Sequence, residues 1–295
     1  MTVSARTEDY IVTDRGGIVE NRHIARSRSM LARVPGLRES DLRCGGHPAI
    51  SDEVNRAWIR SGFTPTGICN NRSAKRVGML AGAAVLGVPF VGYERLDHPM
   101  QVRVKQATED LAGLGPGGGD CIAWGVDGCN LPAPAMPLRD LARTCSSGAK
   151  VPNKEERTRR MARIFHVMSN HPDLVNGEGR FCTSFMQAYG GGLIGKLGAD
   201  GCYGVGIRAS QQTRRISGDG GSEGQALGLT VKVEDGSIEI LYVAIMEILK
   251  QLGIGDPGIW GKLSHFHHVE RKNTMNAVMG QVTPVFEVHP VDAAI

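Results

Sequence analysis

The spacing of apolar side chains along the chain predicts a set of helices that occupies most of its middle. Apolar residues recur every three to four positions in these segments, which is the period of an amphipathic α-helix. Ser51 precedes the first of them and Gly62 follows it, as expected for an N-cap and a C-terminal stop. The predicted helices cover residues 51–62, 73–87, 98–114, 137–144, 153–170, 179–191 and 238–253.

Strand-like segments lie towards both ends of the chain. Glycine turns flanked by β-branched residues predict a strand–turn–strand unit at 9–23 and another at 192–208. Alternation predicts a strand at 228–236, and a final strand is predicted at 278–288. We therefore expect an α/β (α+β) fold in which one antiparallel sheet, formed from both termini, packs against a helical region. The length suits a single domain, 1–295, with a sizeable core.

Composition places the chain among ordinary globular proteins, with 41% hydrophobic and 22% charged residues. The net charge of +4 is small and no Lys/Arg run is interleaved with aromatic side chains, so we expect no nucleic-acid partner. Because the first residues lack an apolar signal-peptide core and no run reaches the length of a membrane helix, we expect a cytoplasmic protein without a membrane partner. Irregularly spaced cysteines without a C-x-x-C pair favour reduced thiols over disulfides.

Eight short segments carry motifs that follow one another in a family-specific order. They read RGGIVENRH, LRCGGHPAISDEVNRAW, NNRSAKRVGML, GYERLDHPMQ, WGVDGCNLPAPAMPL, HPDLVNGEGRFCT, LIGKLGADGCY and VKVEDG. Together they resemble the L-asparaginase II family, the serine-dependent class typified by bacterial and fungal enzymes. The resemblance covers nearly the whole chain and implies a fold like that of the serine β-lactamases. Lys196 and Gly198 would then stand in the place of the K-T-G element of those enzymes.

The resemblance also implies which residues act on a small-molecule substrate. Ser73 and Lys75, in the loop NNRSAKRVG, and Lys196 are the implied catalytic residues. Lys196 would activate a serine or bind a carboxylate. Asp127 is expected to pair with the α-ammonium group of the substrate, and Cys129 is expected to contact the substrate in the same pocket.

Two substitutions remove the metal chemistry that the resemblance implies. Arg72 and Arg76 stand where the family has the cysteine and histidine that hold a zinc ion together with a cysteine at the position of Cys129. A guanidinium has no lone pair to donate and stays positively charged, so we predict neither a metal nor another cofactor. The two arginines would instead add anion-binding capacity to the pocket. Cys182, which lies by the metal in some members, is a substrate contact, a nucleophile activated by Lys196, or a small buried residue.

A block of the family is missing near residues 24–30. There the family carries a strand, an S-x-x-K nucleophile pair and a second serine, whereas IARSRS runs almost directly into the next helix. A serine attacks an amide only when a neighbouring base removes its proton. We therefore expect an asparaginase-type amidohydrolase with impaired or altered activity on asparagine or a related small amide, assembled as a homodimer. Three alternatives stay open: a repurposed enzyme of a fungal-type secondary-metabolite pathway, a non-catalytic pseudoenzyme, and a chain that lacks an exon.

Three other patterns suggest chemistry but favour ordinary structure. Ser147 and Lys150 have the spacing of a Ser/Lys dyad, yet the stretch is polar and does not read as a helix start under a sheet. Residues 190–196 imitate a phosphate loop, but Leu197 replaces the Ser or Thr that would hold Mg²⁺. The histidines within 265–268 are expected on a solvated strand or loop rather than on a metal ion.

Overall fold

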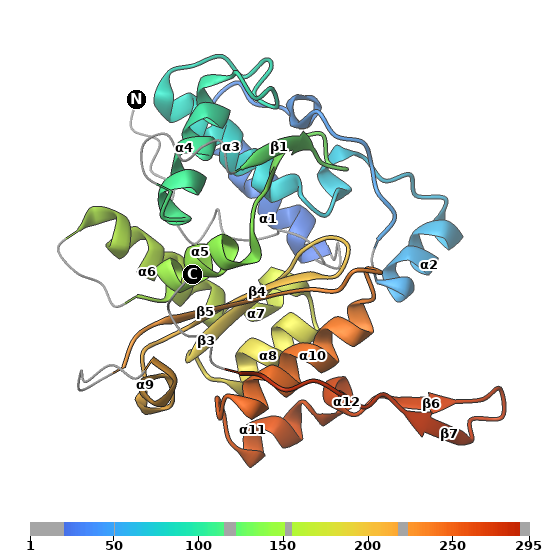
Figure 1. Ribbon diagram of the computed structural model, residues 1–295. Coiled ribbons are helices and arrows are strands. Elements are labelled where there is room, and N and C mark those ends of the chain that lie inside the picture. Colours follow the sequence, from blue (N-terminus) through green and yellow to red (C-terminus); the bar gives the residue numbers. More distant parts are fainter. Residues whose placement is uncertain (1–20, 50, 115–121, 151–154, 218–223, 290–295) are drawn as a thin grey trace.

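Figure 1 shows the computed structural model, which describes residues 21–49, 51–114, 122–150, 155–217 and 224–289. A helical region built from the first part of the chain lies beside a small antiparallel sheet, and further helices cover both faces of that sheet. This mixed α/β architecture is compatible with the predicted α+β class, while the likeness to the serine β-lactamases stays a prediction. None of the helices in the described ranges is long and apolar enough to cross a lipid bilayer.

The helical region has its own hydrophobic core. Its elements are α1 (Asn21–Ala32), η2 (Glu39–Leu42), α2 (Asp52–Ser61), η3 (Gly67–Cys69), α3 (Ser73–Leu86) and α4 (Pro99–Leu111). The core joins α1 and α3 through fully buried side chains, among them Met30, Leu42, Ile68, Val77, Leu80 and Tyr93. A short two-stranded sheet, β1 (Ala123–Val126) and β2 (Pro132–Ala135), follows and contributes Leu131 from its turn. The helices predicted at 51–62, 73–87 and 98–114 are thereby confirmed.

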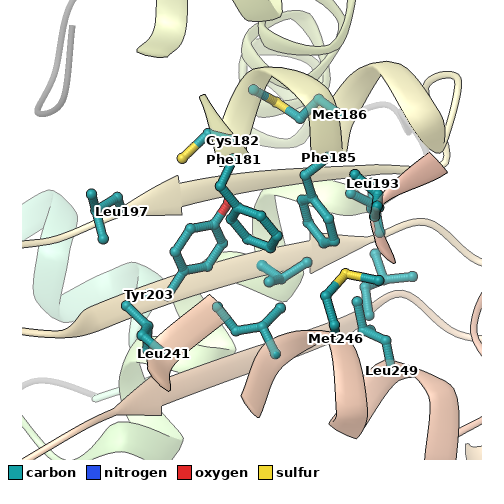
Figure 2. Packing of buried hydrophobic residues seen from close by; sticks show 14 of the residues in the cluster. Phe181, Cys182, Phe185, Met186, Leu193, Leu197, Tyr203, Leu241, Met246 and Leu249 are labelled. Carbon is teal, nitrogen blue, oxygen red and sulfur yellow. The ribbon is translucent and has the colours of Figure 1, made fainter. Parts of the chain in front are cut away.

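The sheet consists of β3 (Leu193–Leu197), β4 (Cys202–Ile207) and β5 (Leu227–Lys232), hydrogen-bonded in that order and antiparallel throughout. Alternation along β4 sends Tyr203, Val205 and Ile207 to one face, as expected for the two-residue period of a strand. That face packs against α8 (Phe181–Ala188) and α10 (Ile238–Gln251) to form the second core. Figure 2 shows these side chains meeting between the helices and the strands.

The other face of the sheet is covered by α5 (Leu138–Ala149), with α6 (Glu156–Asn170) beside it. Glycines on the strands let the backbone of α5 approach very closely. A β-carbon built on Gly228 would lie 1.8 Å from the carbonyl oxygen of Ala142, and one on Gly206 would lie 2.7 Å from that of Cys145. One on Gly204 would lie 2.8 Å from the sulfur of Cys145. Because only a residue without a β-carbon fits at these points, the glycine-rich pattern of the strands fixes the place of α5.

The remaining elements surround this framework. They are α7 (Pro172–Asn176), α9 (Gln211–Ser217), α11 (Pro257–Lys262), α12 (Ser264–His267), β6 (Glu270–Lys272) and β7 (Val278–Gln281). Strands β6 and β7 pair only with each other in the described part of the chain and form a hairpin that projects away from the body of the molecule (Figure 1). Every residue in both strands is exposed.

One of the strand predictions is wrong where the structure tests it, and another is confirmed only in part. The segment predicted as strand–turn–strand at 9–23 ends in α1 instead, because Ile24, Met30 and Leu31 repeat at helical spacing and pack onto α3; residues 9–20 lie outside the described part. The final strand at 278–288 is short, since β7 ends at Gln281 and joins the hairpin rather than the three-stranded sheet. The sheet therefore comes from residues 193–232, and no strand from the C-terminal end of the described chain enters it.

The expectation of solvated histidines at 265–268 is also wrong for His267. Its side chain is buried in α12, and its Nε2 lies 2.9 Å from Oε2 of Glu247 on α10. Burial lowers the pKa of His267 from its ordinary value of 6.5, although the nearby carboxylate opposes this change. The neutral imidazole thus ties α12 to α10.

This buried histidine makes the free energy of unfolding depend on pH. Because the pKa of His267 is lower in the folded state, the unfolded chain binds the proton more readily below the ordinary value of 6.5. The contribution of the neutral His267 side chain to the free energy of unfolding is present above this pH and is lost as the pH falls through it. We expect His267→Gln to show a weaker loss of stability than the wild type between about pH 7.5 and about pH 5.5 in urea unfolding. The exposed His47, replaced in the same way, serves as the control and should keep the wild-type pH dependence.

Candidate active site

A cavity of about 390 Å³ lies between the helical region and the α5 face of the sheet. Its polar groups are Lys75, Asp127 and Lys196, which the sequence places far apart. Apolar side chains and thiols complete the wall, and they belong to Pro132, Ala133, Pro134, Leu141, Cys145, Met168, Ile194, Leu197 and Cys202. The structure therefore brings three of the eight residues predicted for the site together around one space.

Lys75 reaches the cavity from the first turn of α3. The side chain of Asn70 shapes this helix start, because its Oδ1 accepts the backbone N–H of Arg72 at 3.0 Å and its Nδ2 donates to the carbonyl of Gly45 at 3.1 Å. Within the described part of the chain, no carboxylate lies within ion-pair distance of Lys75. The lysine is half-buried.

Ser73 does not share the cavity with Lys75. Residues two apart on a helix point in different directions, so the pair cannot act as a dyad in this geometry. The Ser73 side chain is buried against α1, where its Oγ lies 3.2 Å from Oγ of Ser27. Ser27 comes from the segment IARSRS and was not foreseen, since a lone serine in a basic stretch carries no distinguishing signal.

Asp127 forms a buried ion pair with Arg72. The guanidinium of Arg72 donates to Oδ2 of Asp127, and the two side chains are only 6% and 8% exposed. Oδ1 of Asp127 accepts the backbone N–H of Cys129 at 2.7 Å and that of Leu131 at 3.3 Å. The carboxylate thus holds the turn between β1 and β2 and is neutralised by the arginine that precedes α3.

Lys196 is the last residue but one of β3 and lies on the face opposite the second core. Leu193, Gly195 and Leu197 alternate with it and are buried on that core side. The Nζ of Lys196 donates to the carbonyl oxygen of Leu197 at 3.4 Å. Because Lys196 lies in a strand, residues 190–196 do not form a phosphate-binding loop, which requires a loop that leads into a helix.

Two cysteines of the cavity wall were not among the site residues predicted from the sequence. Cys145 lies on α5 and Cys202 at the start of β4, on the face of the sheet that α5 covers. Burial raises the pKa of Cys145 to about 11, and burial also raises the pKa of Cys202. Both thiols are therefore protonated at neutral pH and are weak nucleophiles. Gly204 and Gly206 follow Cys202 at every second position and so share its face of the sheet. These glycines were the signal in the sequence that a helix packs closely against this face.

Arg76 lies outside the cavity and is completely buried. Its Nη1 donates to the carbonyl oxygen of Leu42 at 2.7 Å and to the hydroxyl of Tyr93 at 2.9 Å. Burial raises the pKa of Tyr93 to about 12, while the arginine opposes this effect. Arg76 therefore joins α3 to the segment around Leu42 and does not face the candidate substrate site.

Neither of the two predicted cysteines lines the cavity. Cys129 is half-buried in the turn after Asp127, and burial raises its pKa against the opposing charge of Arg72. Cys182 is fully buried in the second core, on the other face of the sheet from Lys196 (Figure 2). Its side chain has the position of a packing residue.

The residues at the family's metal position do not fit a zinc ion. Cys129 has the guanidiniums of Arg72 and Arg76 beside it, and both oppose the approach of a cation. Across the described ranges, no three His, Cys, Asp or Glu side chains are grouped as a metal ion requires.

Ser147 and Lys150 do not form a helical pair. Ser147 lies in the last turn of α5, and Lys150 follows the helix end in an extended conformation with an exposed side chain. A Ser/Lys dyad needs both residues on one helical face, so this spacing match has no counterpart in the geometry.

A comparison against family models agrees with the order of the motifs. The model for L-asparaginase II matches residues 17–284, a span that includes every residue of the cavity wall named above. No curated protein matches the chain. Since the match covers most of its length, the chain belongs to the L-asparaginase II family.

Proposed function

We propose that the protein is an asparaginase-type amidohydrolase of reduced or altered activity that acts on a small amide in this cavity. The supporting observation is that Lys75, Asp127 and Lys196, from three separate family motifs, meet around one space. A volume of about 390 Å³ suits a ligand of the size of an amino acid or a somewhat larger molecule.

The cavity supplies some parts of amide hydrolysis and lacks others. The reaction needs a nucleophile, positive charge near the developing oxyanion, and a proton for the departing ammonia. The ammonium groups of Lys75 and Lys196 are suited to stabilising the oxyanion and to giving a proton to the departing ammonia. Among the described residues of the cavity wall, the candidate nucleophiles are the thiols of Cys145 and Cys202, and a water molecule is the alternative. Because burial keeps the thiols of Cys145 and Cys202 protonated, we expect slow turnover.

A second candidate function is ligand binding without turnover. The protonated thiols favour it, and so does the placing of Ser73 against Ser27 rather than against Lys75. A pseudoenzyme of this kind would keep the cavity and its charges, and would bind the same class of ligand. The homodimer, the cytoplasmic location and the fungal secondary-metabolite setting stay predictions from the sequence.

Release of ammonia from asparagine and from succinamate by the purified full-length chain tests the hydrolase directly. We expect slow release that Lys196→Met lowers by about tenfold or more, since removing a group that stabilises the transition-state charge costs one or more orders of magnitude in rate. The exposed Lys262 on α11, replaced by methionine, should leave the rate unchanged.

Two results would count against the hydrolase. If the well-folded wild type releases no ammonia from either amide, the hydrolase is rejected and ligand binding without turnover becomes the candidate function. If ammonia is released at the same rate by Lys196→Met, the reaction takes place outside this cavity. The double variant Cys145→Ala/Cys202→Ala distinguishes the two kinds of nucleophile, because it removes both thiols of the cavity wall and leaves attack by water intact.

A further inference from the structure

Residues 270–289, here called the arm, carry two groups of apolar side chains that face solvent. One group lies on the hairpin of β6 and β7, and the other lies on the extended segment that follows it. All six side chains are between 37% and 96% exposed. Single exposed apolar residues are common, whereas this many on one arm are typical of a contact surface. The hairpin group is Met275, Val278 and Met279, and the segment group is Val285, Phe286 and Val288.

The arm is held in place although its apolar side chains are exposed. Arg271 of β6 forms an ion pair with Glu239 at the start of α10. At the other end of α10, the side chain of Gln251 donates to the carbonyl oxygen of Phe286 at 3.0 Å and accepts the backbone N–H of Val288 at 2.8 Å. These contacts engage the backbone of the extended segment and leave its side chains facing outward. The hairpin projects away from the body of the molecule (Figure 1), so the two groups do not cover each other.

The charges of the arm balance one another. Two glutamates offset one arginine and one lysine, so the arm has no net charge while its histidine is neutral. These charged side chains also form ion pairs within the chain, namely Glu270–Lys272, Arg271–Glu239 and Glu287–His289. A neutral arm has little attraction for nucleic acid or an anionic lipid surface, and two copies of it do not repel each other.

We propose that the arm joins two copies of this chain by a reciprocal contact. The hairpin group of one copy packs on the segment group of the other, and a two-fold axis repeats the contact. Such an arrangement is isologous, because both copies use the same two surfaces. Six side chains with roughly 100 Å² of apolar surface each supply on the order of 600 Å² per copy, which approaches the ~800 Å² per partner of a standard interface.

This association is independent of the proposed hydrolase. None of the six apolar side chains of the arm lines the candidate active-site cavity. Loss of the dimer and loss of ammonia release are therefore separate outcomes, and each can be observed without the other.

Sedimentation equilibrium of the purified full-length chain measures the association. We expect a dimer that Met279→Asp weakens by at least about 100-fold, because the two-fold axis places a desolvated carboxylate in both contacts. Val285→Asp, on the extended segment, should weaken it to a similar extent. Val91→Asp is the matched control, since Val91 is 74% exposed but lies outside the arm, and it should leave the dimer unchanged. A wild type that stays monomeric up to about 100 μM would overturn the proposal.

Mixing the two arm variants tests the reciprocal geometry. In a mixed pair, the intact hairpin of the Val285→Asp chain meets the intact segment of the Met279→Asp chain, so one of the two contacts is restored. With one variant fluorescently labelled, we expect the mixed pair to associate at least about tenfold more tightly than either variant with itself. Absence of this restoration would reject the reciprocal contact. A dimer that neither substitution weakens, with the fold verified by thermal melting, would place the interface elsewhere and overturn the proposal.

Discussion

Replacing Gly228 with alanine is expected to lower the free energy of unfolding by about 3 kcal/mol, the upper end of the range for overpacking. A β-carbon at this position would lie 1.8 Å from the carbonyl oxygen of Ala142 and 3.0 Å from the backbone nitrogen of Ser146. Both atoms belong to the backbone of α5, so no side-chain rotation can relieve the overlap. The helix must move off the sheet, and with it the part of the cavity wall that α5 provides.

Urea unfolding of Gly228→Ala measures this effect, and Gly280→Ala is the matched control. Gly280 lies in the exposed strand β7, and a β-carbon there meets no atom within 4 Å. Its replacement should change stability by less than about 0.5 kcal/mol. Equal stability of the two variants would show that α5 does not lie against β5 as closely as described. The rate of ammonia release should fall together with stability in Gly228→Ala only.

Asp127→Ala is expected to destabilise the protein by about 3–5 kcal/mol, because it removes the buried carboxylate to which the guanidinium of Arg72 and two backbone N–H groups donate. The pair is 6% and 8% exposed, so water cannot replace the lost carboxylate. Loss of activity in this variant would then report unfolding of the loop before α3 rather than the loss of a substrate contact. Thermal melting and urea unfolding of the purified variant measure the loss.

A double-mutant cycle distinguishes the loss of the buried ion pair from the loss of a substrate contact. Arg72→Met/Asp127→Asn removes both charges and should recover most of the stability that either single substitution loses. Asp97→Ala, which breaks the exposed ion pair with Arg95, should leave stability unaffected, since water screens that pair. The stabilising role of the ion pair between Arg72 and Asp127 is rejected if Asp127→Ala unfolds no more easily than Asp97→Ala.

The elements that the sequence predicted correctly are those whose signals are local. Ser51 and Ser237 accept backbone N–H groups at the starts of α2 and α10, and Gly62 ends α2 in the left-handed conformation. The glycine-punctuated segment at 192–208 forms β3 and β4, as its glycine turn and β-branched residues indicated. In each case the deciding contacts lie within a few residues, so the sequence pattern and the geometry coincide.

What the sequence could not show depends on partners that are distant along the chain. The sequence predicted extended structure near residue 278, but it carries no information on whether these residues pair with β6 or with the main sheet. Asp127 was assigned to the substrate, although Arg72, 55 residues earlier in the chain, takes its charge. Ser73 and Lys75 were grouped because they are neighbours in sequence, whereas a helix turns their side chains to different surroundings. Cys145 and Cys202 carry no motif, and only the contact of α5 with the sheet brings them to the cavity.

The hairpin of β6 and β7 gives the molecule two levels of local stability. An isolated two-stranded hairpin is at best marginally stable in water, and this one buries none of the residues in its strands. In the monomer, its hydrogen bonds can therefore open and close many times while both hydrophobic cores stay intact. Amide protons in β6 and β7 will exchange with solvent through this local fluctuation, whereas those in β4, between its two neighbouring strands, exchange only when the sheet itself is lost.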